Sequence, residues 1–417
     1  MTFLEILRYI TIGLGLILSA CYAYQILYLF LPLVKKQPLL CAEKPTRYAI
    51  LIAARNEETV LPHLLESIRQ QDYPASLFTT YVIADNCTDR TAQVAAEHGA
   101  VVFTRQDTSH VGKGYALDHL LRRIALTDGW ENYDAFLIFD ADNVLRPDYI
   151  RKLNHVASCG YDVFCGYRNS KNFGGSWVSA GHALWYLHDS VHLNRSRMLL
   201  GTPCAVTGTG FGFTRQLLEK WDGWHFFTLT EDVEMNTWCA TRGIRVGYCQ
   251  DAMLYDEQPE RFSQSWRQRT RWVQGGVQVS FRYWKDLLRG ICKGGRIGYA
   301  SLETATLSLW GYGTGALCGF LTLLTLFLSS GWLETGKALL WAGIGTYASS
   351  LLVAFMTLLT EWKNIRATSA QKLMAFFAFP LHTLSYIPIG VSALFRKFGW
   401  PPIEHSAALS AQDLITK

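Results

Sequence analysis

The sequence lacks the cysteine patterns that mark zinc sites and disulfide-rich secreted domains. Its ten cysteines are scattered along the chain, and the closest pair is Cys159 and Cys165. Neither a zinc spacing nor a disulfide framework emerges from these positions. We therefore expect the polar part of the chain to face a reducing, cytosolic compartment.

A strong excess of basic charge is also missing. The net charge of +5 is mild for 417 residues, and the polar part contains no basic stripe with interleaved aromatic residues. These two absences argue against nucleic acid as a partner.

Charge is almost absent from four segments, which are 6–34 after Arg8, 303–329, 336–360 and 373–395. Each is long enough to cross a hydrocarbon core of ~30 Å, which needs roughly 20 helical residues. No small-residue cleavage site follows the first segment, and it is about twice as long as the core of a signal peptide, so we interpret it as a span. The pattern predicts a multi-pass protein of the plasma membrane.

The alternation of apolar and polar stretches predicts five parts. They are an N-terminal transmembrane helix at 1–39, a cytoplasmic α/β domain at 40–256, amphipathic interfacial helices at 257–300, C-terminal transmembrane helices at 301–397 and a tail at 398–417. Basic residues gather after the first span and before the second, which places the large domain in the cytoplasm and Met1 outside. These residues are Lys35, Lys36, Lys44, Arg47, Arg282, Lys285, Arg289, Lys293 and Arg296.

The segment 373–395 conflicts with a simple span. If it crossed the bilayer, Arg396 and Lys397 would lie outside, against the distribution of basic residues in the other loops. It also contains Pro380 and Pro388, which break helical hydrogen bonding. We expect a broken or re-entrant pair of half-helices, packed against protein, that leaves the tail in the cytoplasm.

The segment Ala135–Asp142 is a short apolar run that ends in two carboxylates, Asp140 and Asp142. This pattern predicts a central parallel strand that carries charge to the sheet edge where α/β folds bind ligands. Neighbouring carboxylates repel each other unless a cation lies between them, and their oxygen ligands suit Mg²⁺ or Mn²⁺ shared with substrate phosphates. The alternative is that the two carboxylates bind no ligand and only place charge at a solvent-exposed strand end.

Other strands and helices around this segment predict a doubly wound nucleotide-binding half. Three more strands are expected, at Tyr48–Ala54, Thr80–Ala84 and Ala100–Thr104. Asp85 leaves the second of them directly, so it either faces a ligand or belongs to the N-cap turn of the next helix. Lys113, between two glycines, opens a helix where the backbone can approach a ligand and positive charge is added.

The next stretch is less regular. The pattern predicts a strand at Tyr161–Gly166, an amphipathic helix near the membrane surface at Trp177–Leu199 and a short strand at Arg245–Tyr248. Between them lies a run of small residues that includes Gly208, Thr209 and Gly210. Such a run is either a tight turn or a place where a sugar lies close to the backbone.

Glu231 and Asp232 begin a predicted helix after Thr230. Carboxylates at a helix start often only complement the helix dipole. Leu229 and Val233 flank these two residues, and an apolar surrounding raises the pKa of a carboxyl group toward that of a useful general base. We therefore expect Asp232 at the lip of a catalytic site.

Gln268, Arg271 and Trp272 are spaced so that one helix face carries all three. The segment Glu257–Leu288 around them is basic and aromatic, as an interfacial amphipathic helix is without any ligand. An amide, a guanidinium and an indole on one face also suit a diphosphate and a sugar ring.

Four of these motifs, taken in chain order, resemble those of the membrane-embedded processive β-glycosyltransferases of glycosyltransferase family two. They are Asp85, Asp140-Ala-Asp142, Thr230-Glu231-Asp232 and Gln268-Arg269-Thr270-Arg271-Trp272. The family includes cellulose, hyaluronan, poly-N-acetylglucosamine and chitin-oligosaccharide synthases. The resemblance covers essentially the whole chain, and Trp400–His405 resembles a tail motif of related enzymes. It implies an α/β fold, a GT-A-type nucleotide-sugar-binding domain with transmembrane and interfacial helices.

The resemblance also implies a role for each matching residue. The nucleotide would be lined by Ala53, Arg55, Glu57, Asp85 and Lys113, and the metal and diphosphate would be bound by Asp140 and Asp142. Asp232, beside Glu231, would be the general base. The diphosphate and the acceptor end would be held by Gln268, Arg271 and Trp272, next to an acceptor loop at Gly208, Thr209 and Gly210. The turn after Asp85 and this loop depart from the family pattern, which leaves the sugar and the degree of processivity open.

The expected activity is inverting, metal-dependent transfer from UDP-GlcNAc or UDP-Glc to a growing β-linked polysaccharide in the bilayer, with Mg²⁺ or Mn²⁺ as cofactor. Export through the chain, with accessory export subunits, is a further option, and stacking surfaces for a glycan would be Trp310, Tyr312, Trp332, Trp341 and Tyr347. The alternative is non-processive transfer of one sugar to a lipid or lipid-linked acceptor. A transporter is disfavoured because the hydrophobic segments show no evident inverted repeat. A sugar-binding module without catalysis is another alternative, and it would need no general base.

Overall fold

The computed structural model describes residues 2–35, 44–395 and 409–415. The tail motif Trp400–His405 and the predicted part boundaries near 39 and 397 lie outside these ranges. Among the described cysteines, eight are free thiols and Cys159 is disulfide-bonded, so the predicted lack of disulfides does not extend to Cys159.

One mixed sheet forms the centre of the globular part. Its strands are β1 (Tyr48–Ala54), β2 (Phe78–Asp85), β3 (Val101–Arg105), β4 (Ala135–Asp140), β5 (Val144–Leu145), β6 (Val163–Ser170), β7 (Phe211–Thr214) and β8 (Val246–Asp256). They lie in the order β3-β2-β1-β4-β7-β6-β8-β5. The strands β3, β2, β1 and β4 are parallel, as predicted. The apolar runs of β1, β2 and β4 are largely buried, as suits a sheet that is covered on both faces, whereas the edge strand β3 is partly exposed.

The second half of the sheet differs from the prediction. The strand β7 is antiparallel to both β4 and β6, and β8 continues to Asp256 instead of ending at Tyr248. The pairing of β8 with β6 jumps from Cys249 to Met253 at a bulge. The polar residues Gln250 and Asp251 lie in that bulge, so the sequence resembles a strand end at a point where the strand only bends.

Helices cover both faces of the sheet and create two cores. Alternate residues of β1 point to opposite faces: Ile50 and Ile52 pack with α3 and α6, and Ala49 and Leu51 pack on the other face with α5. The helices of the globular part are α3 (Leu61–Arg69), α4 (Thr91–Glu97), α5 (Lys113–Thr127), α6 (Tyr149–Ser158), α9 (Arg215–Trp221) and α10 (Glu231–Arg242), with short turns at Ala75–Leu77 and Trp130–Asn132.

The predicted membrane-surface helix at Trp177–Leu199 is instead mostly buried. It consists of α7 (Trp177–His188), a π-helical segment η3 (Asp189–Asn194) and α8 (Arg195–Leu200). The helix α7 packs against β6 on one side and against α13 and α14 on the other. The prediction was wrong because its aromatic residues serve protein contacts on several sides.

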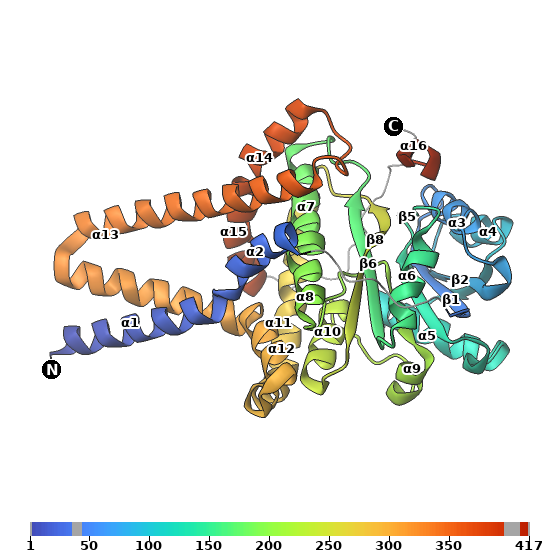
Figure 1. The fold of residues 1–417 in the computed structure, drawn as a ribbon, viewed down its shortest axis with the longest axis horizontal. Coiled ribbons are helices and arrows are strands. Elements are labelled where there is room, and N and C mark those ends of the chain that lie inside the picture. Colours follow the sequence, from blue (N-terminus) through green and yellow to red (C-terminus); the bar gives the residue numbers. More distant parts are fainter. Residues whose placement is uncertain (1, 36–43, 396–408, 416–417) are drawn as a thin grey trace.

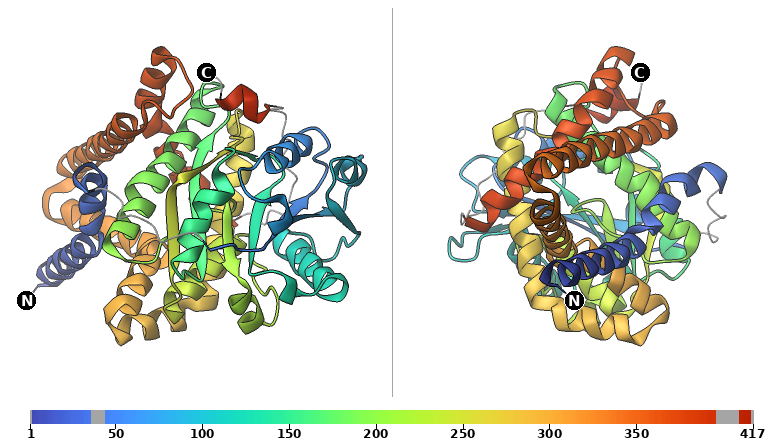
Figure 2. Two further views of the ribbon diagram at one scale, coloured as in Figure 1. Left: turned by 45° about the vertical axis from the view of Figure 1, so that its right-hand side comes forward. Right: turned by 90° about the vertical axis from the view of Figure 1, so that its left-hand side faces the viewer.

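Long apolar helices extend away from the globular part. They are α1 (Phe3–Tyr22), which continues into α2 (Tyr24–Val34), and α13 (Leu309–Glu361). At Gly331, φ is +76° and α13 turns back on itself, so that its first arm lies beside α1 and its second arm returns toward the globular part (Figure 1; Figure 2). Within the described residues, three helical stretches are long and apolar enough to cross a membrane: Phe3–Val34, Leu309–Glu361 and Ser369–Phe395.

Four of the remaining helices lie where the long helices meet the globular part: α11 (Phe262–Lys293), α12 (Gly295–Thr306), α14 (Ser369–Leu384) and α15 (Tyr386–Phe395). The short helix α16 (Ala411–Ile415) lies elsewhere. The predicted break in 373–395 occurs at Ser385, between α14 and α15. Arg269 of α11 stabilises the junction between α14 and α15, because its Nη1 donates to the Ser385 hydroxyl at 2.8 Å and to the His382 carbonyl at 3.0 Å.

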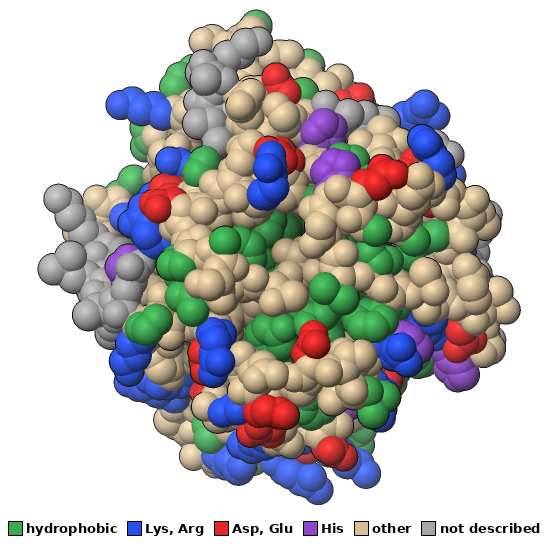
Figure 3. All heavy atoms as spheres, turned by 90° about the vertical axis from the view of Figure 1, so that its right-hand side faces the viewer, with side chains coloured by type: hydrophobic (Ala, Val, Ile, Leu, Met, Phe, Trp, Pro, Cys, Tyr) green, Lys and Arg blue, Asp and Glu red, His purple; other side chains and the backbone are tan. Residues whose placement is uncertain are grey.

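The helix α16 packs on the globular part, where Ala411 and Leu414 join the core and Arg366 donates to the Asp413 carbonyl. It therefore lies on the same side of the long helices as the sheet (Figure 1). The face of the molecule opposite the long helices carries charged side chains of both signs around a hydrophobic centre, as expected for a water-facing surface (Figure 3).

This arrangement predicts the sidedness of the chain. In a variant with Cys292 replaced by serine, a cysteine at Ser410 should react with a membrane-impermeant maleimide only in inverted membrane vesicles. A cysteine at Ser330, next to the turn of α13, should react only in right-side-out vesicles. Labelling of Ser410→Cys only from outside would contradict the proposed cytoplasmic tail.

Candidate active site

The candidate site begins at the carboxyl edge of β1, β2 and β4. Ala53 of β1 is the register partner of Asp140 at the end of β4. Asp85 ends the neighbouring strand β2 and accepts a hydrogen bond at 2.6 Å from the buried guanidinium of Arg105. Parallel strands present their carboxyl ends to one edge, so residues far apart in the sequence meet here, as predicted.

Lys113 connects this edge to the second half of the chain. Its Nζ donates to Asp140 Oδ1 and, at 2.7 Å, to the carbonyl of Gly208, and it lies 3.9 Å from Glu231 Oε1. Burial alone would lower the pKa of Lys113, but the carboxylates of Asp140 and Glu231 raise it above its ordinary value. The ammonium therefore stays charged between two acidic motifs.

Glu231 and Asp232 form the first turn of α10 and line the same cavity as Lys113. Burial is the main cause that raises the pKa of both carboxyl groups, and Lys113 opposes it. Thr230, the N-cap residue, makes no side-chain cap. A raised pKa and a position at a cavity wall suit a general base.

The loop before β7 brings backbone, rather than side chains, close to Asp232. Gly208 has a φ of +85°, and a Cβ at this position would lie 3.6 Å from Asp232 Oδ2. Thr209 and Gly210 do not line the cavity, unlike the other residues predicted for the site. Thr209 Oγ1 instead accepts from the Asp140 amide at 2.9 Å, and a Cβ at Gly210 would meet Leu254. These two residues support the strand ends that form the site.

Asp142 follows the end of β4 and lies beside a pair of residues that the sequence patterns did not single out, Arg168 and Asp256. Asn143 Nδ2 donates to Asp256 Oδ1 at 3.0 Å and contacts Asp142 Oδ1 at 3.4 Å. Arg168 Nε donates to Asp256 Oδ2 at 2.9 Å. Burial raises the pKa of Asp256 to about 6 although Arg168 opposes this.

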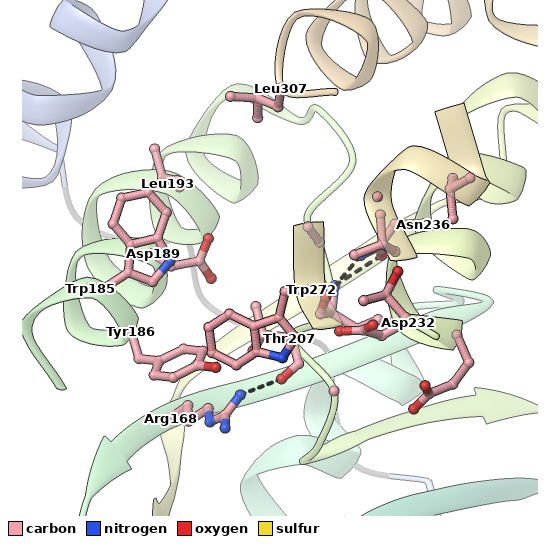
Figure 4. Close-up of a pocket in the computed structure, with 18 of the residues that line it drawn as sticks. Arg168, Trp185, Tyr186, Asp189, Leu193, Thr207, Asp232, Asn236, Trp272 and Leu307 are labelled. Atoms are coloured by element: carbon pink, nitrogen blue, oxygen red, sulfur yellow. Dashed lines mark hydrogen bonds between the residues drawn. The ribbon is translucent and has the colours of Figure 1, made fainter. Parts of the chain in front are cut away.

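Gln268, Arg271 and Trp272 of α11 lie on one helix face and line the cavity, as predicted. Arg271 Nη1 donates to the Leu229 carbonyl at 3.2 Å, just before the Glu231 turn. The Trp272 ring packs edge-on against Tyr186, and the Arg168 guanidinium lies 3.7 Å from the centroid of the Tyr186 ring. Figure 4 shows Trp272, Tyr186 and Arg168 to the left of Asp232 in the cavity.

A single cavity of about 1160 Å³ joins these groups. At the sheet edge it is lined by Arg55, Glu57, Asp85, Lys113, Asp140 and Asp142. Beyond Asp232 it continues between α7, α12 and the two arms of α13. Within the described residues, Arg55 Nε and Nη1 and Gln268 Oε1 are buried without a hydrogen-bond partner. Buried polar groups of this kind are usually satisfied, so these atoms are available to a polar ligand.

The residues at the sheet edge fit a hard divalent cation. Asp140 and Asp142 supply carboxylate oxygens to one cavity, and Mg²⁺ or Mn²⁺ commonly binds one or two carboxylates and completes its shell with phosphate and water oxygens. In the described part of the chain, no cluster of three or more His, Cys, Asp or Glu residues is arranged to hold a metal without a substrate.

Two kinds of site residue escaped prediction. Asp256 obeys the same strand-end rule as Asp140, but the bulge at Gln250 hid the end of its strand. Arg168 lies near the end of β6, which continues beyond Gly166, where the predicted strand ended, so the prediction did not include it. Trp185 and Asp189 also line the cavity. They were assigned to a membrane-surface helix, so their inward direction was missed.

Comparisons with known proteins agree with this geometry. A family model described as glycosyltransferase like family 2 matches residues 45–275. A β-monoglucosyldiacylglycerol synthase of Synechocystis sp. is 26% identical over 258 residues, which are 60% of this chain and 52% of that protein. A poly-β-1,6-N-acetyl-D-glucosamine synthase of Staphylococcus aureus is 23% identical over 256 residues, 60% of this chain and 59% of that protein. The chain thus aligns with little more than half the length of these curated relatives.

Among solved structures, a mannosyltransferase from Pyrobaculum calidifontis in complex with GDP-Man and Mn²⁺ matches with a TM-score of 0.55 and 20% sequence identity. The match covers 93% of this chain and 99% of that chain. The predicted GT-A-type α/β fold is confirmed by this likeness and by the family match.

The Arg168–Asp256 pair generates a stability prediction. Arg168→Met should lower the unfolding free energy of the globular part by about 3–5 kcal/mol, because it leaves a buried carboxylate without its cation. Thermal unfolding of the detergent-solubilised chain measures this effect. The double variant Arg168→Met/Asp256→Asn should recover much of the loss, since no uncompensated charge remains. Equal stability of the single variant and the wild type would contradict the assignment.

Proposed function

The chain belongs to the family described as glycosyltransferase like family 2, and on this basis we propose that it transfers a hexosyl group from a nucleotide diphosphate sugar to a hydroxyl group of a membrane lipid. The observation that carries this proposal is the continuity of the cavity. One space links Lys113 and Asp140 at the sheet edge to Tyr312 and Ser349 on the two arms of α13.

The shape of this cavity favours a lipid acceptor. Its far end follows one face of the returning arm of α13, which consists of small residues, namely Ala342, Gly345, Thr346, Ser349 and Ser350. Small side chains on a spanning helix leave room for an apolar chain, while the polar groups near Asp232 suit a headgroup. The β-monoglucosyldiacylglycerol synthases among the relatives are named for a glycolipid product, which supports the same acceptor class.

The donor is proposed to be a UDP-sugar, bound as the family resemblance implies. Ala53, Glu57 and Asp85 would contact the nucleoside, and Arg55 and Lys113 would face the diphosphate. Bound Mg²⁺ or Mn²⁺, held by Asp140 and Asp142, would neutralise charge on the departing diphosphate. Lys113 and Arg271 add positive charge from two other sides of the same space.

The proposed reaction is an in-line displacement that inverts the anomeric carbon. Asp232 accepts the proton of the attacking hydroxyl, which typically contributes about 10²–10⁴-fold to the rate. The bond between the sugar and the diphosphate breaks as the new glycosidic bond forms, and the nucleoside diphosphate leaves. Glu231 remains beside Lys113 and preserves the charge balance around the base.

Polymerisation of a β-linked glycan is the second candidate. The Gln268, Arg271 and Trp272 face and the Staphylococcus aureus relative, named a poly-β-1,6-N-acetyl-D-glucosamine synthase, favour it. The aromatic residues expected to guide an exported glycan do not gather in one passage. Tyr312 lines the cavity, whereas Trp332 and Trp341 are 79% and 69% exposed on the long helices. Export through this chain or through accessory subunits is therefore the less supported proposal.

We further propose a plasma-membrane protein with its globular part in the cytoplasm, where nucleotide sugars occur. The basic residues next to the long helices support this orientation.

One experiment tests the proposed function and separates the two acceptors. The purified chain is incubated with radiolabelled UDP-Glc, UDP-GlcNAc or GDP-Man, with Mg²⁺ or Mn²⁺, in nanodiscs that contain diacylglycerol and monoacylglycerol. We expect a labelled product of lipid mobility that carries one sugar. A water-soluble ladder would favour polymerisation instead, and a lack of any transfer with all three donors would contradict both candidates.

The role of Asp232 yields a second prediction. Asp232→Asn should abolish transfer while nucleotide affinity in calorimetry stays nearly unchanged, because the amide cannot accept the proton. Since burial raises the pKa of Asp232, the wild type should lose activity as the pH falls through this raised value, above the range of an exposed aspartate. Substantial activity in Asp232→Asn would show that another group is the base.

A further inference from the structure

The part of the cavity beyond Asp232 contains polar groups that the proposed reaction does not use. Trp185, Asp189 and Leu193 form one wall, Asn236 lies on the opposite side, and Leu307 lies at the top of the view (Figure 4). Figure 4 shows Asp189 directed into the cavity, across from Asp232. The two aspartates thus belong to different elements, η3 and α10, and face a shared space.

Asp189 is a partly buried carboxylate with unused acceptor capacity. Asn194 Nδ2 donates to its Oδ2 at 3.2 Å, and in the parts of the chain that the structure describes no ion pair involves Asp189. The nearby cation Arg197 instead forms an ion pair with Glu303, to which its Nε donates at 2.9 Å. Burial raises the pKa of Asp189 to about 6, although Arg197 and Arg168 oppose this. A carboxylate offers about four acceptor positions, and within the described residues the side-chain hydrogen bond that Asp189 accepts is the one from Asn194.

The local backbone explains why the Asp189 side chain points into the cavity. Asp189 is the first residue of the π-helical segment η3, and wider turns of this kind often occur at functional sites because they redirect side chains. Trp185 lies one helical turn earlier, on the same face. It is 38% exposed and lines the same cavity, whereas its neighbours Leu184 and Leu187 are fully buried. An indole and a carboxylate therefore lie side by side at the cavity wall.

We propose that Trp185 and Asp189 bind the polyol headgroup of the acceptor lipid, a glycerol or sugar with a second free hydroxyl. The inference rests on the proposed function and deepens it. Asp189 accepts a hydrogen bond from the hydroxyl that does not react, and Trp185 packs against the carbon face of the polyol. The reacting hydroxyl is thereby turned toward Asp232, and the acyl chains extend along the small-residue face of α13.

Such a subsite would select acceptors by their hydroxyl groups. A site built to hydrogen-bond a hydroxyl strongly rejects a ligand that lacks it, because the partly buried carboxylate then loses its partner. The structure thus assigns lipids with a vicinal or adjacent hydroxyl as acceptors. Lipids with a quaternary ammonium headgroup have no hydroxyl to offer Asp189.

The test measures lipid binding by the full chain in detergent micelles without any donor. The probe is a fluorescent monoacylglycerol, whose glycerol carries two free hydroxyls, and fluorescent phosphatidylcholine serves as the comparison lipid. Asp189→Leu should weaken monoacylglycerol binding about tenfold to hundredfold, the effect of losing a hydrogen bond to a charged group. UDP affinity in the same variant should not change. Asp189→Asn, which keeps a carbonyl acceptor, should show an intermediate loss, and Trp185→Leu should weaken binding independently.

The matched control is Asp251→Asn, which removes a carboxylate from the exposed bulge of β8, outside the cavity. It should bind monoacylglycerol like the wild type. Wild-type-like binding by Asp189→Leu and Trp185→Leu would overturn the subsite, as would equal wild-type affinity for the two lipids. If binding depends on Asp189 but no sugar is transferred, the subsite stands and the proposed function fails. If sugar is transferred to monoacylglycerol and this transfer is insensitive to Asp189, the proposed function stands and the subsite fails.

Discussion

The site depends on one buried ammonium group, that of Lys113. It is held by Asp140 from β4, by the Gly208 carbonyl from the loop before β7 and by the nearby Glu231 of α10. Each of these segments comes from a different region of the chain. A charge removed from water is costly unless it is paired, so the ammonium and the two acidic motifs require one another. This mutual requirement brings the proposed metal ligands and the proposed base into one cavity.

The sheet and α11 then determine which ligands can reach this cavity. The parallel half of the sheet carries its polar strand ends to one edge, and α11 lies along the opposite wall with Gln268, Arg271 and Trp272 directed inward. Arg269, on another side of α11, secures the break between α14 and α15 instead. Two neighbouring arginines therefore serve different purposes, one toward the ligand space and one toward the membrane-side helices. The result is a site that opens both to the sheet edge and to the long helices.

Sequence patterns predicted the half of the site that obeys local rules. Apolar runs that end in Asp85 and Asp140 predicted parallel strands and their shared edge, and the spacing of Gln268 and Trp272 predicted a common helix face. The prediction failed where tertiary contacts decide the outcome. The bulge at Gln250 concealed Asp256, and burial of α7 on several sides turned Trp185 and Asp189 inward. Thr209 and Gly210 looked like ligand contacts, but they support strand ends, which a loop sequence alone does not reveal.

The central claim is that one cavity holds the donor at the sheet edge and the acceptor on the membrane side of Asp232. A structure of the chain with UDP and Mn²⁺ tests it most directly. The account predicts the diphosphate between Lys113 and Arg271 and the ion beside Asp142, with the space between Asp232 and Asp189 left open. A nucleotide bound between Asp232 and Asp189, or away from Asp140, would contradict it.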